Sequence, residues 1–336
     1  MPKILFLSYR WNDQRLKTHS SDAMMANGFA RDGWCCEYHD YREYTKNHGH
    51  RMNQSKIYRN IMNHNPDIVF ITKGEKVDPA TIRKCRQSGF KGKVIGWYND
   101  VRKQPIKCVI EISKVCDWFF HCIGGDDLKR YYNATKTPCS FLFSPFDPSF
   151  ISPKPFDERT YNVTHYGQLY NPERGFDSMR RDIVPEVRDL ICDYGACFDK
   201  GFIRGIEYYR ALGNSKMSIS IPAIDIPLYF SNRHSHIMGS GSVVLSYDFK
   251  RCRDIFTEGV DIVTFKNHEE LRNKIKYYLN NTDELEQIQK NSLNFAEKYL
   301  TSNRVYEEIV YTLANGESSY SFGETVNPAK RKILDA

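Results

Sequence analysis

The sequence lacks the features that identify membrane, secreted and zinc-stabilised proteins. No apolar run approaches the roughly 20 residues that a membrane-spanning helix needs, and the apolar run after Met1 and Pro2 is too short for the core of a signal peptide. None of the ten cysteines forms a CxxC pair. We therefore expect a cytoplasmic protein with reduced cysteines, without disulfides or a structural metal.

The short motifs of several α/β enzyme classes are also missing. Neither GxGxxG nor GxxxxGK[ST] follows the first apolar run, which argues against a nicotinamide or P-loop nucleotide site. The absence of GxSxG argues against an α/β-hydrolase. No DxD carboxylate pair is present, so the sequence predicts no catalytic metal site.

The composition is that of an ordinary globular protein with an uneven charge. The chain has 336 residues, 40% of them hydrophobic and 26% charged, a length that suits two domains of roughly 150 residues. Residues 1–150 hold 24 Lys and Arg against 15 Asp and Glu, whereas the remaining residues hold 24 against 26. The positive first half predicts an anionic partner such as nucleic acid, a phosphoglycan or a membrane surface.

The first half alternates short apolar runs with helix-compatible stretches, a pattern that predicts a parallel sheet with helices on both faces. The expected strands are 3–8, 35–38, 66–72, 93–98, 116–120 and 139–143. The rest of 34–53 is expected to be a basic, aromatic loop that either clamps a substrate or is simply solvated. Ligands of such sheets lie beyond the carboxyl ends of the strands. The candidate site residues there are Asp13, His19, Lys73, Asp100 and Arg102.

A Pro-rich segment divides the chain, and a second alternating series follows it. Residues 144–157 hold four prolines, which marks a domain boundary. Strands are expected at 161–166, 189–194, 217–221, 243–245 and 261–265, with a helix over 174–190 and a capping box from Asn267 to Glu270. The expected parts are a first domain (1–145), a linker (146–157), a second domain (158–300), a helix packing back towards the first domain (301–315) and a weakly ordered tail (316–336).

The stretch Ser231–Ser246 allows two interpretations. Its small-residue turn, Gly239 to Ser242, could let the backbone approach a ligand closely. Alternatively, a helix packs through Ile237 and Met238 and ends at a Gly-rich stop.

The order and spacing of features over about residues 60–310 resemble the GT-B glycosyltransferases, most of all the spore-maturation CgeB-like group. The similarity is carried by Pro66–Phe70, Trp97 with Asp100, Phe146-Asp147-Pro148, Asp225-Ile226-Pro227, Arg233, Gly241–Leu245, Asp254–Phe256, Gly259, Glu269–Leu271 and Ile275–Leu279. The resemblance implies two Rossmann-like, doubly wound domains facing a central cleft. It also implies a nucleotide-diphosphate sugar on the second domain, an acceptor on the first, and no further cofactor.

With this resemblance, the second half gains a set of candidate donor-binding residues. They are Gly167, Gln168, Arg174, Lys216, Arg233, His236, Gly241 and Ser242, with Arg180 and Arg204 as further cations. Cleavage of the sugar–diphosphate bond leaves negative charge on the leaving group, which such cations stabilise without a metal. His236 departs from the family pattern, which has a carboxylate there to hold the ribose hydroxyls, so the sequence leaves the donor's identity open.

An inverting transfer needs a base on the acceptor side, for which Asp13 and Asp100 are the candidates. The expected partners are a nucleotide sugar and an anionic acceptor on the basic first domain, including DNA, with the chain acting as a monomer or homodimer. Two alternatives stay open: a nucleic-acid-binding protein on a degenerate GT-B scaffold, and a nucleotide-sugar epimerase.

Overall fold

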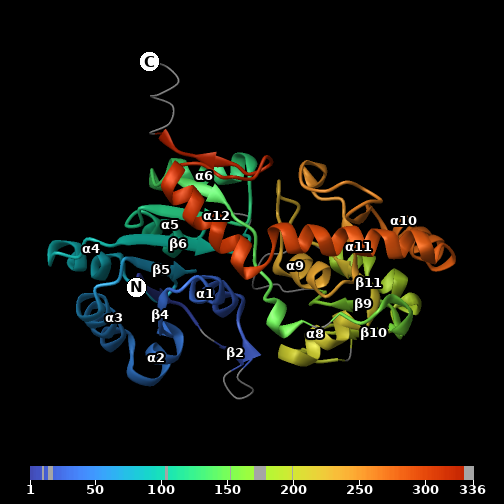
Figure 1. Ribbon diagram of the computed structural model, residues 1–336, viewed down its shortest axis with the longest axis horizontal. Helices are drawn as coiled ribbons and strands as arrows, with labels where there is room; N and C mark the ends of the chain where they lie inside the picture. The colour runs from blue at the N-terminus through green and yellow to red at the C-terminus, as the bar shows by residue number, and fades with distance from the viewer. Residues whose placement is uncertain are drawn as a thin grey trace. The chain divides into compact units, whose positions relative to one another are not determined.

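The chain folds into two compact units, each built around one main sheet (Figure 1). The computed structural model describes residues 1–9, 11–13, 18–102, 105–151, 153–169, 179–198 and 200–328, with the backbone alone for 11–13 and 18–19. Unit 1 consists of Met1–Asp100, Gln104–Leu142 and Val305–Ala336, and unit 2 of Val101–Lys103 and Phe143–Arg304.

The sheet of unit 1 has seven strands in the order β14-β8-β7-β6-β5-β1-β4. Their bounds are β1 Lys3–Leu7, β4 Cys35–His39, β5 Ile68–Thr72, β6 Lys93–Tyr98, β7 Trp118–His121, β8 Cys139–Phe141 and β14 Thr325–Val326. Neighbouring strands are parallel except for β14, which runs antiparallel to β8. The winding direction reverses between β1 and β5, and such a switch point is where doubly wound sheets bind ligands.

Seven helices belong wholly or mostly to the described part of unit 1. They are α1 Ser21–Arg31, α2 Tyr41–His48, α3 His50–His64, α4 Pro79–Gln87, α5 Lys107–Ser113, α6 Gly125–Thr135 and α12 Ser302–Asn315. The N-terminus of α1 is capped by Ser20, whose Oγ accepts a hydrogen bond from the Ala23 amide at 3.1 Å. α4 begins with Pro79, whose missing N–H is not needed in the first turn. A short antiparallel pair, β2 Trp11–Asp13 and β3 Thr18–His19, precedes α1.

The segment that follows β4 is helical, so the loop expected there is wrong. Asp40 caps α2 by accepting a hydrogen bond from the Glu43 amide at 3.0 Å. Tyr41 is fully buried, and its hydroxyl donates to the Thr72 carbonyl at 2.8 Å. The basic and aromatic composition therefore reflects one buried anchor and an exposed polar helix face, which a reading by composition alone cannot separate.

Residues 316–328 also differ from the expectation of a weakly ordered tail. Glu308 of α12 accepts hydrogen bonds from the Ser318 hydroxyl at 2.6 Å and the Ser319 amide at 3.1 Å. β14 then joins the edge of the sheet beside β8. Figure 1 draws α12 and β14 in red next to the earlier strands of this unit. Residues 329–336 lie outside the described part of the chain.

Unit 2 has five strands, all parallel, in the order β10-β9-β11-β12-β13. The strands are β9 Tyr161–Tyr166, β10 Asp193–Gly195, β11 Ser215–Ser220, β12 Val243–Tyr247 and β13 Val263–Phe265. The helices are α7 Met179–Ile183, α8 Gly205–Gly213, α9 Asn232–Gly239, α10 His268–Asn280 and α11 Thr282–Tyr299. Here the winding reverses between β9 and β11, which marks the second switch point.

Apolar side chains from strands and helices form the core of unit 2. Val163, Met217 and Val243 of three neighbouring strands pack in one buried cluster with Leu271 of α10 and Leu285 of α11. The expected capping box at the start of α10 is confirmed in its first bond, from the Glu270 amide to Asn267 Oδ1 at 2.8 Å. The Glu270 carboxylate accepts from the Lys266 amide instead of closing the box.

The long helix expected over 174–190 is replaced by shorter pieces. α7 ends at Ile183, and a 3-10 helix runs over Pro185–Leu190. Pro185 has no N–H and therefore interrupts α-helical hydrogen bonding. Residues 170–178 lie outside the described part of the chain.

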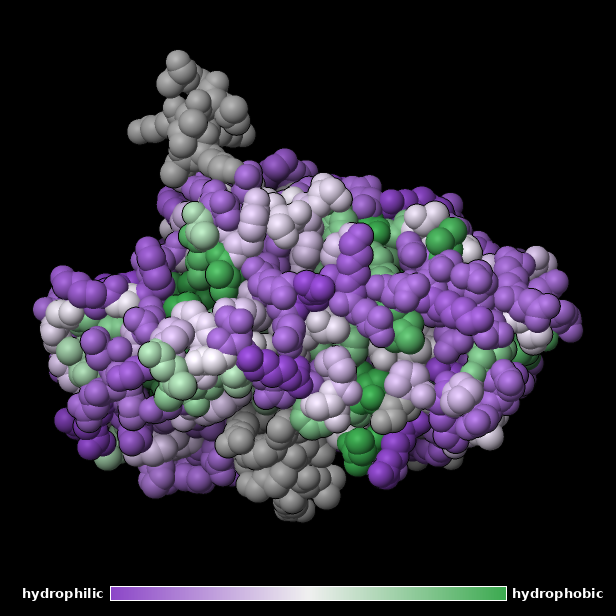
Figure 2. All heavy atoms as spheres, in the orientation of Figure 1, coloured by the Kyte–Doolittle hydropathy of each residue, from purple (hydrophilic) through white to green (hydrophobic). Residues whose placement is uncertain are grey.

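The two parallel sheets confirm the expected α/β fold of two Rossmann-like units. The surface shown in Figure 2 is mostly hydrophilic, with scattered apolar patches. No helix in the described parts of the chain combines the length and the hydrophobicity that a membrane span requires.

Candidate functional site

The switch point of unit 2 holds an arginine side chain against a glycine. Gly167 directly follows β9, and a Cβ built on it would lie 3.0 Å from Nη2 and 3.1 Å from Cζ of Arg233. Nη1 of the same guanidinium donates to the carbonyl of Ile221, which directly follows β11, at 3.3 Å. The guanidinium thus lies at the carboxyl ends of the two strands where the winding reverses.

The local fold explains this position. α9 starts after Ser231, so its first turn lies at the carboxyl edge of the sheet and carries Arg233. Arg180 of α7 reaches the same place, because its Nε donates to the Ile221 carbonyl at 2.8 Å and its Nη1 to the Gln168 carbonyl at 3.3 Å. Two guanidinium groups therefore share one backbone acceptor, and their combined positive charge makes this edge suitable for an anion.

Two neutral histidines lie next to these cations. Burial, together with the charge of Arg233, lowers the pKa values of His165 and His236 to about 3. Nδ1 of His165 lies 3.2 Å from the Ile219 carbonyl; since a carbonyl only accepts, Nδ1 carries the proton and Nε2 is left as an acceptor. Among the described residues, neither Nε2 of His165 nor Nε2 of His236 has a hydrogen-bond partner, and both atoms are buried.

Aromatic rings surround the imidazole of His236. The ring centroids of Tyr208 and Tyr209 lie 5.7 Å and 5.2 Å from it, both in edge-on geometry. Tyr208 also contacts Tyr166 of β9 edge-on at 5.7 Å. These contacts fix the ring in an apolar setting, which accounts for its preference for the neutral form.

Three expected donor-site residues lie at the opposite edge of the sheet. In a parallel βαβ unit the helix runs against the strands, so the turn after α9 returns to their amino ends. Gly241 and Ser242 occupy that turn, and Lys216 lies near the start of β11 with its Nζ 5.4 Å from the Phe156 ring centroid. The structure does not bring these three residues to Arg233.

A buried arginine accounts for Gly241. Nη1 of Arg159 donates to the carbonyls of Ser215 at 2.7 Å and Gly241 at 2.5 Å, and its Nη2 donates to the carbonyl of Lys154 at 2.9 Å. Gly241 has φ +68°, and a Cβ there would lie 2.7 Å from Arg159 Nη2. The glycine is therefore explained by backbone geometry and close packing at the amino edge. The second interpretation of Ser231–Ser246, a helix with a Gly-rich stop, fits this turn.

Two further cations were expected at the donor site of unit 2, and one of them is among the residues that the structure describes. Arg204 is exposed at the start of α8, with its Cζ 4.9 Å from the Phe202 ring centroid. Arg174 lies outside the described residues.

The switch point of unit 1 holds a second group of charged side chains. Lys73 follows β5 and Asp100 follows β6, and Lys73 Nζ lies 3.6 Å from the Asp100 carboxylate. Lys73 and Arg42 also lie over the ring of Tyr9, which follows β1, at 5.6 Å and 4.2 Å from its centroid. Arg42 in turn pairs with Glu75. Two of the residues expected after the strands are therefore adjacent.

Asp22 belongs to this group and was not expected. It lies in the first turn of α1, is 1% exposed, and accepts a hydrogen bond from the Thr72 hydroxyl at 2.9 Å. Burial raises its pKa to about 6 although the charge of Lys73 opposes the shift. The sequence contains a feature that could have identified Asp22. The helix after the first strand begins at the carboxyl edge of the sheet, where ligands bind, and Ser20 is a typical N-cap that marks this beginning. The side chains of Asp13 and His19 lie outside the described residues, and Arg102 belongs to unit 2.

Solved glycosyltransferase structures share this two-sheet architecture over nearly the whole chain. HepE from Anabaena, in complex with UDP-glucose, matches with a TM-score of 0.63 at 11% identity and covers 94% of this chain and 100% of its own. Sucrose-phosphate synthase from Thermosynechococcus elongatus gives 0.61 at 10% identity, covering 94% and 98%. An alpha-glucosyltransferase in complex with UDP-glucose and DNA containing an abasic site gives 0.59 at 12% identity, covering 94% and 100%. At such identities the matches establish the GT-B fold.

The sequence of unit 2 is similar to a known enzyme family. Residues 177–310 match a protein-family model described as glycosyl transferase-like. The chain therefore has the GT-B fold, and its residues 177–310 are similar to glycosyl transferases. The matched segment includes Arg180, Arg233 and the strands β10 to β13. The comparison with curated proteins gives no significant sequence match.

Proposed function

We propose that this chain is a glycosyltransferase that moves a sugar from a nucleotide-diphosphate sugar to an anionic acceptor, without a metal ion. In this proposal unit 2 binds the donor and unit 1 the acceptor. The HepE and alpha-glucosyltransferase structures are complexes of those proteins with UDP-glucose. A hexose donor linked to a nucleoside diphosphate is therefore the first donor class to test.

The observation that carries the proposal is the position of Arg233. Its guanidinium lies at the switch point of unit 2, and no Asp or Glu in the described part of the chain pairs with it. Breaking the sugar–phosphate bond leaves charge on the terminal phosphate of the nucleoside diphosphate. A planar guanidinium binds two such oxygens at once, and it stabilises the leaving group most when that charge is largest.

The neighbouring imidazoles help to determine which donor fits. With pKa values of about 3, His165 and His236 are neutral near pH 7 and add no charge to the site. Each presents one unpartnered ring nitrogen, which can make a single hydrogen bond. His236 can therefore meet one hydroxyl group, where a carboxylate would meet two. We infer a weaker hold on the ribose than in relatives that carry an acidic residue there.

On the acceptor side, Asp22 and Asp100 are the described carboxylates closest to Lys73. The pKa of about 6 for Asp22 lies near neutral pH, where a general base works best. Asp100 forms an ion pair with Lys73 and is the more accessible of the two. Asp13 stays a third candidate from the sequence. Separate Asp-to-Asn changes at the three positions distinguish them, because loss of the base lowers kcat and leaves donor binding intact.

Whether the transfer reaction needs a metal ion can be tested with a chelator. Among the described residues no group of three or more His, Cys, Asp or Glu is arranged to hold a metal ion. We expect transfer to persist when EDTA is present throughout the assay. Activity that disappears with EDTA and returns with Mg²⁺ or Mn²⁺ would contradict this part of the proposal.

The deciding experiment compares Arg233→Gln with Arg210→Gln. Arg210 is exposed on α8 and pairs only with Glu207 among the described residues, so its variant carries the same charge change without touching the site. We expect wild type and R210Q to be stabilised thermally by UDP-glucose or another nucleotide sugar, and R233Q not to be. Product analysis then separates sugar transfer from epimerisation of the free donor. A wild-type protein that responds to no nucleotide sugar or nucleoside diphosphate refutes the proposal.

A further inference from the structure

Two neighbouring segments of unit 1 contain many basic residues and no acidic ones. Residues 50–64 and 79–93 together contain eight Lys and Arg and not a single Asp or Glu. These residues form α3, α4 and the turn that leads into β6, and α3 packs against α4. We name this surface the α3–α4 face. Its exposed cations are Arg51, Arg59, Arg83, Lys84, Lys91 and Lys93.

These six cations have no ion-pair partner among the described residues. The exception on the same face is the half-buried Arg86, which pairs with Asp117 at 2.5 Å. Elsewhere in the molecule exposed lysines commonly have a carboxylate nearby, as in Lys114 with Glu111 and Lys290 with Glu286. Even with Asp117 and with Asp78, which pairs with His50 at 2.9 Å, most of the positive charge of the α3–α4 face is left unbalanced, and it attracts anions from solution.

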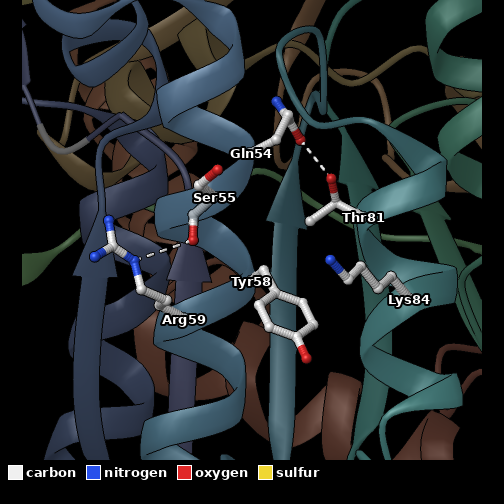
Figure 3. Close-up of a pocket in the computed structure, with 6 residues that line it drawn as sticks. All are labelled: Gln54, Ser55, Tyr58, Arg59, Thr81 and Lys84. Atoms are coloured by element: carbon white, nitrogen blue, oxygen red, sulfur yellow. Dashed lines mark hydrogen bonds between the residues drawn. The ribbon is translucent and has the colours of Figure 1, made fainter.

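A groove between the two helices lies within this charged surface (Figure 3). It has a volume of about 240 Å³ and is lined from α3 by Gln54, Ser55, Tyr58 and Arg59 and from α4 by Thr81 and Lys84. Figure 3 shows Tyr58 and Lys84 lying between the helices. Lys84 Nζ is 4.8 Å from the centroid of the Tyr58 ring, and the Tyr58 hydroxyl donates to Ser88 Oγ at 3.0 Å. The two side chains are thus held in place before any partner binds.

The character of the surface favours a nucleic acid over a lipid membrane. Proteins that bind membranes peripherally combine basic residues with several apolar side chains that enter the bilayer. In the two segments of this face, Met52 is the single large hydrophobic side chain that is exposed. Arg51 and Arg59 are eight positions apart on α3, which corresponds to about 12 Å along the helix. That distance covers roughly three or four phosphates of one strand.

We propose that the α3–α4 face binds the phosphodiester backbone of a nucleic acid. This proposal depends on the proposed function only because both assign an anionic partner to unit 1. The charged residues at the two switch points take no part in the binding proposed here. Arg59 and Lys84, on the two sides of the groove, contact the phosphates, and Tyr58 supplies a ring beside them. Because phosphate contacts dominate, the binding depends on salt and not on base sequence.

The test measures binding of a short fluorescent DNA duplex and of a single strand by anisotropy, in the absence of nucleotide sugar. The variant R59E/K84E is compared with K250E/K276E, which reverses two exposed lysines of unit 2 and alters the net charge equally. We expect wild type and K250E/K276E to bind alike and R59E/K84E to bind about tenfold or more weakly. The slope of log affinity against log salt should fall by about two, one for each lost phosphate contact.

Several outcomes would overturn the proposal. If R59E/K84E binds DNA as tightly as wild type, the α3–α4 face is not the binding surface. If K250E/K276E loses as much affinity as R59E/K84E, the net charge of the protein explains the binding and the position of the cations does not. Tighter binding to anionic phospholipid vesicles or to inorganic polyphosphate than to DNA identifies a different partner. Thermal unfolding controls for folding, and these exposed positions are expected to leave it unchanged. Because no donor is present, failure here is distinguishable from failure of the transfer reaction.

Discussion

Replacing Gly167 by alanine tests the contact between the end of β9 and Arg233. The new Cβ would lie 3.0 Å from Nη2, which is tighter than an ordinary van der Waals contact. Gly167 is not among the glycines with positive φ, so its backbone accepts alanine without strain. The guanidinium is the mobile end of a long side chain and must move by a few tenths of an ångström. Its bond to the Ile221 carbonyl, already 3.3 Å long, then weakens.

The expected magnitude follows from the strength of a charged hydrogen bond. A displaced guanidinium forms a poorer hydrogen bond with a phosphate oxygen of the ligand. Such a charged bond contributes about 1.5–3 kcal/mol, and losing roughly half of it costs about 1 kcal/mol of binding free energy. We therefore expect the Kd for a nucleoside diphosphate to rise about fivefold in G167A. Isothermal titration calorimetry measures this change directly, and the midpoint of thermal unfolding should stay close to that of wild type.

Gly195→Ala is the matched control. It also lies at the carboxyl end of a strand in unit 2, and its new Cβ would approach Ile203 Cγ2 at 3.0 Å. The crowding is the same, but the neighbour is apolar. If G167A and G195A bind the diphosphate as tightly as wild type, or if both lose the same affinity, the contact with Arg233 does not determine donor binding and the reasoning is refuted.

Three further predictions concern the stability of the protein and the amino edge of the unit 2 sheet. Asp22→Asn should become more stable relative to wild type as the pH rises from 4 to 7. The pKa of Asp22 is raised to about 6, so ionisation of this buried carboxyl lowers the free energy of unfolding of the wild type by about 3 kcal/mol, and asparagine avoids that loss. Urea unfolding of both proteins at pH 4 and pH 7 measures the effect. A stability difference that is the same at both pH values contradicts it. Arg159→Met should lower the free energy of unfolding by about 3 kcal/mol, because four backbone carbonyls lose a hydrogen-bond donor. Lys216→Gln changes a residue at the amino edge and should leave the KM for the donor unchanged. A severalfold rise in this KM would indicate that Lys216 contributes to donor binding.

The sheets were predictable because their strands are short apolar runs buried on both faces. The five residues of β5 are all buried, and the run that predicts it has no competing pattern. The prediction from composition was wrong for the segment after β4, where a single buried residue anchors a polar helix. Tyr41 decides that α2 packs on the sheet, and nothing in its polar neighbours distinguishes this from a loop.

The strand pattern locates candidate site residues only near the ends of strands, whereas Arg233 and Arg180 of the helices α9 and α7 were candidates through the family resemblance. Gly167, Lys73 and Asp100 could be found in this way, because the carboxyl ends of parallel strands meet at one edge. Gly241 was misplaced because its glycine turn precedes a strand and therefore lies at the other edge. Asp22 depends on where a helix begins, which sequence patterns locate less well than the strand before it.

The most direct test of the central claim is a crystal structure of the protein soaked with a nucleoside diphosphate. We expect the diphosphate at the switch point of unit 2, with the Arg233 guanidinium within hydrogen-bond distance of its oxygens and the chain at Gly167 beside it. A diphosphate bound at the glycine turn of Gly241, or bound without contact to Arg233, would contradict the account.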